Sequence, residues 1–184
     1  MPVPRYQWFK AAVFALLVLN TGVYLASGTL SEGLDSIAWL TLLALFQLET
    51  GYGQVLRAGP AVTAVRAIRL VALAVIGAAA AGFLYNGEWL DAANSGLWIA
   101  VVVLLEVEVR RPADVAAQRA RFTAAAALLY AGLIAVMFVW LARGEWFDAY
   151  DAALWLVAFA TIEMNLLEAA RRAAAGRHTV RTVA

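Results

Sequence analysis

Acidic side chains recur at fixed spacing in this chain of 184 residues, and they are its strongest candidates for chemistry. In three places an acid is followed three residues later by a second acid or an amide, and four residues after that by a tryptophan. On a helix this spacing puts the three side chains on nearly the same face. The three stripes are Glu32, Asp35 and Trp39; Asp91, Asn94 and Trp98; and Asp148, Asp151 and Trp155. Around one axis, the five acids would form an outer acidic rim that concentrates cations.

The outer acidic rim also has a purely structural explanation. Each pair lies near the expected start of a helix, where the dipole stabilises a carboxylate by about 0.3–1 kcal/mol. Side chains at this position also cap free backbone N–H groups. The sequence leaves both explanations open.

A second set of polar residues follows each tryptophan after eight and ten residues. The pairs are Gln47 and Glu49, Glu106 and Glu108, and Glu163 and Asn165. Acids in such apolar sequence, near a helix C-terminus, usually face a bundle interior or pair with a cation. The expected partners are Arg66, Arg69, Arg119 and Arg121, with Arg5 and Lys10. Glu49, Glu106 and Glu163 are thus candidates for an ion-binding or gating site, or for Arg–Glu pairs that lock adjacent helices together.

The stripes belong to a longer repeat, which the chain contains three times without a gap. The repeated segments are residues 24–49, 83–108 and 140–165. Besides the acid and the tryptophan they share a leucine and a glycine, namely Leu25, Leu84 and Leu141, and Gly28, Gly87 and Gly144. Repetition at this scale indicates one supersecondary unit used three times.

Composition places these units in a membrane. The chain is 64% hydrophobic and 15% charged, with a mean hydropathy of +0.77, whereas soluble domains have about 25% charged residues. Cysteine is absent and the single histidine is His178, which excludes thiolate chemistry and multi-histidine metal sites. The sequence identifies no metal, and we expect no cofactor.

Six apolar stretches are long enough to cross or nearly cross a bilayer of about 30 Å. They cover residues 7–26, 34–49, 67–85, 89–107, 117–142 and 147–168. Pro4, Pro60 and Pro112 precede the odd-numbered stretches, and proline suits a first helical position. We therefore predict an all-α integral membrane protein of six transmembrane helices. They form three tandem parallel helical hairpins with pseudo-threefold symmetry about the membrane normal. The repeats cover approximately residues 4–50, 60–109 and 112–168, in one domain of residues 1–168 that precedes a basic tail at residues 169–184.

Charge sets the expected orientation. Of the 14 lysines and arginines, all but Arg143 fall on the side of the termini, so the positive-inside rule makes both termini cytoplasmic, in a bacterial inner membrane. A cleaved signal peptide is the alternative for the first stretch, although cleavage near Ala26 would destroy the first hairpin. We predict that Tyr85, Trp89, Trp140 and Trp146 form an aromatic belt at the outer interface. Asn20 is expected to make an interhelical hydrogen bond.

These features predict a cation or proton channel or transporter, with a non-catalytic scaffold or accessory subunit of a larger membrane complex as the alternative. The pattern Asp148-x-x-Asp151 resembles the aspartate pairs with which membrane prenyltransferases of the UbiA type hold Mg²⁺ and diphosphate. The chain is too short for that fold and has no Gly-rich phosphate loop, HExxH or GxSxG motif, so we expect no enzyme. The expected partners are the lipid bilayer, cations or protons, and other copies or subunits, but no nucleic acid.

Overall fold

The computed structural model describes residues 4–56 and 60–161, and this part of the chain is helical apart from short turns. It contains α1 (Pro4–Ser27), α2 (Leu30–Leu56), α3 (Pro60–Asn86), α4 (Trp89–Arg110), α5 (Pro112–Ala117), α6 (Arg119–Arg143) and a seventh helix over residues 146–161. The prediction of an all-α protein is confirmed. Glu163, Asn165 and the basic tail at residues 169–184 lie outside the described residues.

Four of the described helices are long and apolar enough to cross a membrane. These candidate spans are Gln7–Ser27, Pro60–Asn86, Trp89–Glu108 and Arg119–Arg143. The predicted spans at residues 34–49 and 147–168 are not among them. In α2 the apolar middle lies between Glu32 and Asp35 on one side and Gln47 and Glu49 on the other, and the second of those spans runs beyond the described residues.

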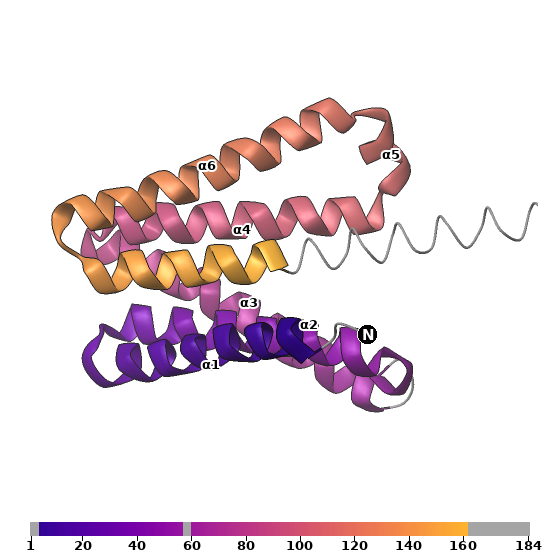
Figure 1. Cartoon of the computed structure of the whole chain (residues 1–184), viewed down its shortest axis with the longest axis horizontal. Coiled ribbons are helices and arrows are strands. Elements are labelled where there is room, and N and C mark those ends of the chain that lie inside the picture. The colour runs from indigo at the N-terminus through magenta and orange to yellow at the C-terminus, as the bar shows by residue number, and fades with distance from the viewer. Residues whose placement is uncertain (1–3, 57–59, 162–184) are drawn as a thin grey trace, which may run out of the picture.

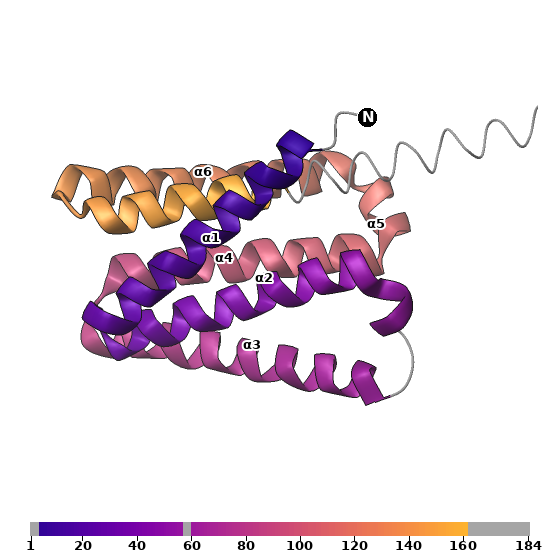
Figure 2. The same cartoon turned by 60° about the horizontal axis from the view of Figure 1, so that its bottom comes forward.

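The helices lie side by side with their chain reversals at opposite ends of the bundle. The turns α1–α2, α3–α4 and α6–seventh helix gather at one end, which we call the turn end (Figure 1, Figure 2). The start of α1, the end of α2, the start of α3 and the short helix α5 lie toward the other end (Figure 1, Figure 2). Along the chain, α2 packs against α1 and α3, α3 against α4, and α4 against α6.

The turns have equivalent glycines but not equivalent conformations. Gly87 and Gly144 have φ of +79° and +80°, and the residues after them, Glu88 and Glu145, donate backbone hydrogen bonds to carbonyls five residues earlier. This is the Schellman motif, which ends a helix with a left-handed residue. At the first turn, the Gly28 N–H instead donates to Tyr24 O at 2.9 Å, as within a helix.

One expected helix start is wrong. Pro112 does not begin the long helix of the third repeat but α5, a helix of six residues with the proline in its first turn. The long helix, α6, begins at Arg119. Gln118 lies between the two with non-helical φ and ψ of −119° and 29°, so the chain bends once more than the sequence pattern indicates.

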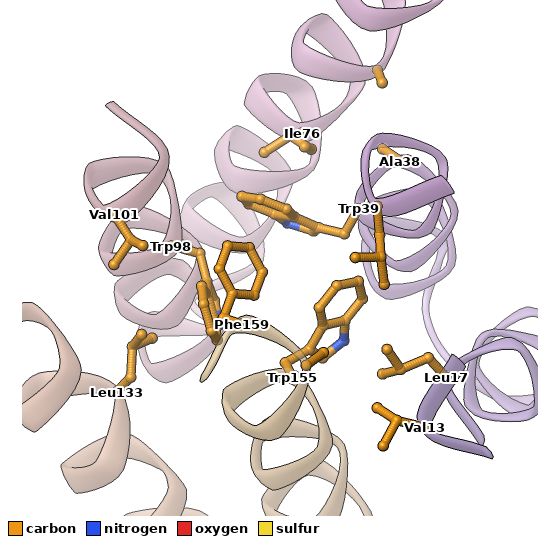
Figure 3. Packing of buried hydrophobic residues seen from close by; sticks show 13 residues of the cluster. Val13, Leu17, Ala38, Trp39, Ile76, Trp98, Val101, Leu133, Trp155 and Phe159 are labelled. Atoms are coloured by element: carbon orange, nitrogen blue, oxygen red, sulfur yellow. The ribbon is translucent and has the colours of Figure 1, made fainter. Parts of the chain in front are cut away.

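The tryptophans of the three repeats meet in the core (Figure 3). Trp39 lies 6.4 Å, centroid to centroid, from both Trp98 and Trp155. Phe159 contacts Trp98 at 4.6 Å and Trp155 at 6.4 Å. Tilted aromatic pairs at these distances contribute about 0.5–1.5 kcal/mol each beyond the apolar area that they bury. The fully buried Leu17, Ile76 and Leu133 complete this cluster from α1, α3 and α6.

Replacing Gly144 by alanine should destabilise the protein, because a left-handed conformation costs an L-residue about 1–2 kcal/mol. The matched control is Gly96→Ala, since a Cβ there points into open space and alanine is the better helix former. Thermal unfolding in detergent should give a lower Tm for Gly144→Ala and an unchanged or higher Tm for Gly96→Ala. Equal shifts would contradict the assigned turn.

Candidate acidic cavity

A cavity of about 60 Å³ lies at the turn end of the bundle, above the tryptophan cluster. Every residue that lines it occupies one of five positions of the sequence repeat. The first position contributes Tyr24, Phe83 and Trp140; the second Glu32, Asp91 and Asp148; the third Asp35, Asn94 and Asp151; the fourth Ser36 and Ala152; and the fifth Trp39, Trp98 and Trp155. We call this the acidic cavity. Its volume is enough for about four to six water molecules.

The helix ends explain why these side chains converge. Tyr24, Phe83 and Trp140 lie in the last turns of α1, α3 and α6, while the acids at the second position lie in the first turns of the helices that follow. The third and fifth positions follow one and two turns further along the same faces. Each hairpin therefore presents one wall of the cavity from both of its helices.

Five carboxyl groups line the acidic cavity, and none of the residues that line it is a lysine, arginine or histidine. Carboxylates gathered in a confined space repel one another and attract cations. The five acids of the predicted outer acidic rim therefore all line one cavity.

Tryptophan side chains form the floor of this cavity, and one of them donates a hydrogen bond to an acid of the lining. Trp39 Nε1 donates a hydrogen bond to Asp35 Oδ1 at 3.2 Å. Trp155 occupies the equivalent position, four residues after Asp151, and also lines the cavity. The second stripe breaks this pattern, because it has an amide in place of the acid. Asn94 Oδ1 is buried without a hydrogen-bond partner among the described residues.

Two hydrogen bonds join α1 to the acids of the third repeat. Asn20 Nδ2 donates to Asp151 Oδ1 and the Tyr24 hydroxyl donates to Asp148 Oδ1, both at 2.9 Å. The interhelical hydrogen bond predicted for Asn20 is confirmed. The equivalents of Asn20 in the other repeats are Ala79 and Val136, which have no side-chain donor.

The acids at the second repeat position have different surroundings. Glu32 Oε2 accepts a hydrogen bond from the Thr29 N–H, while the Glu32 N–H donates to Thr29 Oγ1 at 3.3 Å. This reciprocal arrangement is a capping box, so the structural explanation holds for Glu32. Within the described residues Asp91 has no hydrogen bond or ion pair with another side chain, while Asp148 accepts a hydrogen bond from Tyr24.

Among the described residues, the inner acids do not line a comparable cavity. Glu49 of α2 forms an ion pair with Arg69 of α3, and the two side chains are 36% and 43% exposed. This contact is one of the two alternatives from the sequence, an Arg–Glu pair that joins adjacent helices. Glu106, Arg66 and Arg119 are exposed, Arg121 bonds to Gln118 at 3.1 Å, and Glu163 lies outside the described residues. A second cavity, of about 20 Å³, lies beyond the tryptophan cluster and is lined by Lys10, Gln47 and Thr161 among others.

The residues at the first repeat position line the cavity, although the sequence did not identify them as candidates. The available signal was an aromatic residue at this position in all three repeats. The sequence instead predicts that Trp140 belongs to the interfacial belt. That assignment is wrong, because Trp140 is 4% exposed and lines the cavity, whereas Tyr85, Trp89 and Trp146 are 92%, 69% and 68% exposed. Within residues 4–56 and 60–161, no group of three acids or histidines could hold a metal ion.

Replacing Tyr24 by phenylalanine removes the hydroxyl that donates to Asp148 and should weaken the contact between α1 and the seventh helix. A hydrogen bond to a charged group contributes about 1.5–3 kcal/mol, so Tyr24→Phe should lower the Tm measurably in detergent. Tyr85→Phe is the matched control, because Tyr85 is exposed and its loss should change stability by less than about 0.5 kcal/mol. If both variants unfold at the same temperature, the hydrogen bond between Tyr24 and Asp148 does not contribute to stability.

No protein family, no curated protein and no solved structure matches this chain significantly.

Proposed function

We propose that this protein carries a cation or a proton across a membrane, and that the acidic cavity is where the ion binds. The observation that supports this function is a cavity with five carboxyl groups and no basic side chain. Confined negative charge without a fixed partner is unfavourable until a cation or proton neutralises it. Of these acids, Asp91 is the leading binding residue, because Glu32 caps α2 and the other three accept side-chain hydrogen bonds.

We further propose that the chain crosses the membrane six times, as three hairpins around a pseudo-threefold axis. The gap-free sequence repeat supports this arrangement. So do the five repeat positions that account for the whole lining of the acidic cavity, and the contact among the three equivalent tryptophans. In this arrangement α2 and the seventh helix are the two additional spans.

The proposed orientation places both termini in the cytoplasm of a bacterial cell and the acidic cavity toward the outside of the inner membrane. Its support is the basic sequence at the end of the bundle opposite the cavity, including Lys10, Arg66, Arg69 and Arg119. Positive residues favour the cytoplasmic side. The acidic cavity would then collect cations from the outside.

A carrier fits this architecture better than an open pore. The cluster of Trp39, Trp98, Trp155 and Phe159 separates the acidic cavity from the smaller cavity near Lys10 and Gln47. An ion could pass only if this apolar layer rearranged, as in alternating access around a fixed site. Glu106 and Glu163 remain proposed residues of an inner site or gate, whereas we now assign Glu49 to the ion pair with Arg69.

A flux assay in liposomes tests this proposal. Purified protein should dissipate a proton, Na⁺ or K⁺ gradient faster than empty liposomes. Asp91→Asn should slow that flux by about tenfold, equivalent to about 1.4 kcal/mol of lost binding free energy. Asp114→Asn is the matched control, because Asp114 is an exposed acid in α5 at the opposite end. If the flux of protons, Na⁺ and K⁺ equals that of empty liposomes, the transport proposal is contradicted.

The second candidate is a non-catalytic scaffold or accessory subunit, which the apolar cluster and the Glu49–Arg69 ion pair favour. On either proposal we expect Glu49→Gln to act on stability, by up to about 1 kcal/mol for a partly exposed pair. It should not change the ion flux per folded protein. Thermal unfolding and the flux assay, applied to the same preparation, separate the two effects. A large loss of flux at unchanged Tm would instead make Glu49 a transport residue.

A further inference from the structure

We infer that the ion bound in the acidic cavity is an alkylammonium ion that keeps at least one N–H group. This inference rests on the proposed function, since it specifies which class of cation the cavity accepts. Any cation would neutralise the negative charge of the carboxylates in the cavity. Three features indicate which class of cation fits best. They are the aromatic lining, the spacing of the acids and a buried hydrogen-bond acceptor without a partner in the described structure.

Aromatic side chains make up a large part of the cavity lining. Each repeat contributes two, one at its first position and one at its fifth. Tyr24, Phe83 and Trp140 therefore surround the cavity near the helix ends, and the tryptophan cluster closes it below. Aromatic faces attract ammonium ions by cation–π interaction, with tryptophan the strongest partner. Aromatic rings interleaved with carboxylates are the surroundings that an alkylated cation requires.

The spacing of the carboxylates disfavours a bare metal ion. Hard cations such as Ca²⁺ need six to eight oxygen ligands at about 2.3–2.6 Å. Among the described residues, no three acids come close enough together to hold such an ion. An alkylammonium ion spreads its charge over the hydrogens of several carbon atoms, so it can interact with carboxylates on opposite walls without bringing them together.

The third feature is the amide of Asn94, which interrupts the repeat of acids. This amide occupies the position of Asp35 and Asp151, and its Oδ1 atom is buried without a partner in the described structure. A buried hydrogen-bond acceptor without a donor is energetically costly. An N–H group of a bound ammonium ion would remove that cost. The cavity volume of about 60 Å³ corresponds to about four to six water molecules, which suits an ion with a similar number of non-hydrogen atoms.

Trimethylammonium is the probe, and the full-length protein in detergent micelles is the sample. Tryptophan fluorescence should change saturably as trimethylammonium chloride is added, because four tryptophans line the cavity. NaCl at the same ionic strength should neither reproduce the change nor compete with it. Tetramethylammonium, which has no N–H group to offer Asn94, should bind more weakly.

Phe83→Leu should weaken trimethylammonium binding by about 2- to 30-fold, the range that a cation–π contact of 0.5–2 kcal/mol implies. Trp89→Leu is the matched control, because Trp89 is exposed and does not line the cavity. Phe83→Tyr keeps the ring and should keep the affinity, which guards against a loss of folding. Thermal unfolding of each variant gives the folded fraction.

The outcomes separate the two proposals. If Na⁺, K⁺ or protons are transported but trimethylammonium does not bind, the ammonium assignment is overturned and the proposed function stands. If no cation binds and no flux is seen, both are overturned. Equal affinities for Phe83→Leu and Trp89→Leu would also overturn the assignment, because the ring would then contribute nothing.

Discussion

The rest of the structure depends on the contact among Trp39, Trp98 and Trp155. One tryptophan from each repeat packs against the others or against Phe159, in a layer that crosses the bundle. In each repeat an acid lies seven residues before the tryptophan, and an acid or an amide lies four residues before it. Bringing the rings together therefore also brings these polar side chains together, one and two turns nearer the helix ends. The same contact therefore builds the floor of the acidic cavity and closes the axis beneath it.

Negative charge in the cavity is held in place unequally by the three repeats. Asn20 and Tyr24 hold the acids of the third repeat, and Thr29 holds Glu32. Asp91, in the described part of the chain, accepts no hydrogen bond from a side chain of another helix. Some acids of the cavity are thus positioned by hydrogen bonds, while Asp91 lacks a side-chain partner in the described structure. Such a cavity can combine a fixed geometry with an available charge, and reversible ion binding needs both.

Breaks in the repeat have identifiable physical consequences. Ser36 bonds to Thr21 at 2.8 Å, whereas Ser95 Oγ is buried without a partner in the described residues, because the residue equivalent to Thr21 is Ala80. Asn94 replaces an acid and likewise keeps an unpartnered oxygen. Both exceptions fall in the second repeat, next to Asp91. The site that we propose is therefore asymmetric, although its walls come from equivalent segments.

The sequence by itself determined the helical class, the turn positions and the stripe of acid, acid or amide, and tryptophan. These features follow from helical periodicity and from glycine or proline chemistry within one segment. Only the tertiary structure decided which stripes face one another. Trp140 illustrates this, since an aromatic residue near a helix end suits a lipid interface and a cavity wall equally well. Glu49 illustrates it again, because its choice of Arg69 over other basic residues depends on how α2 packs against α3. Spacing along the chain sets the face of a helix, but packing between helices sets what that face meets.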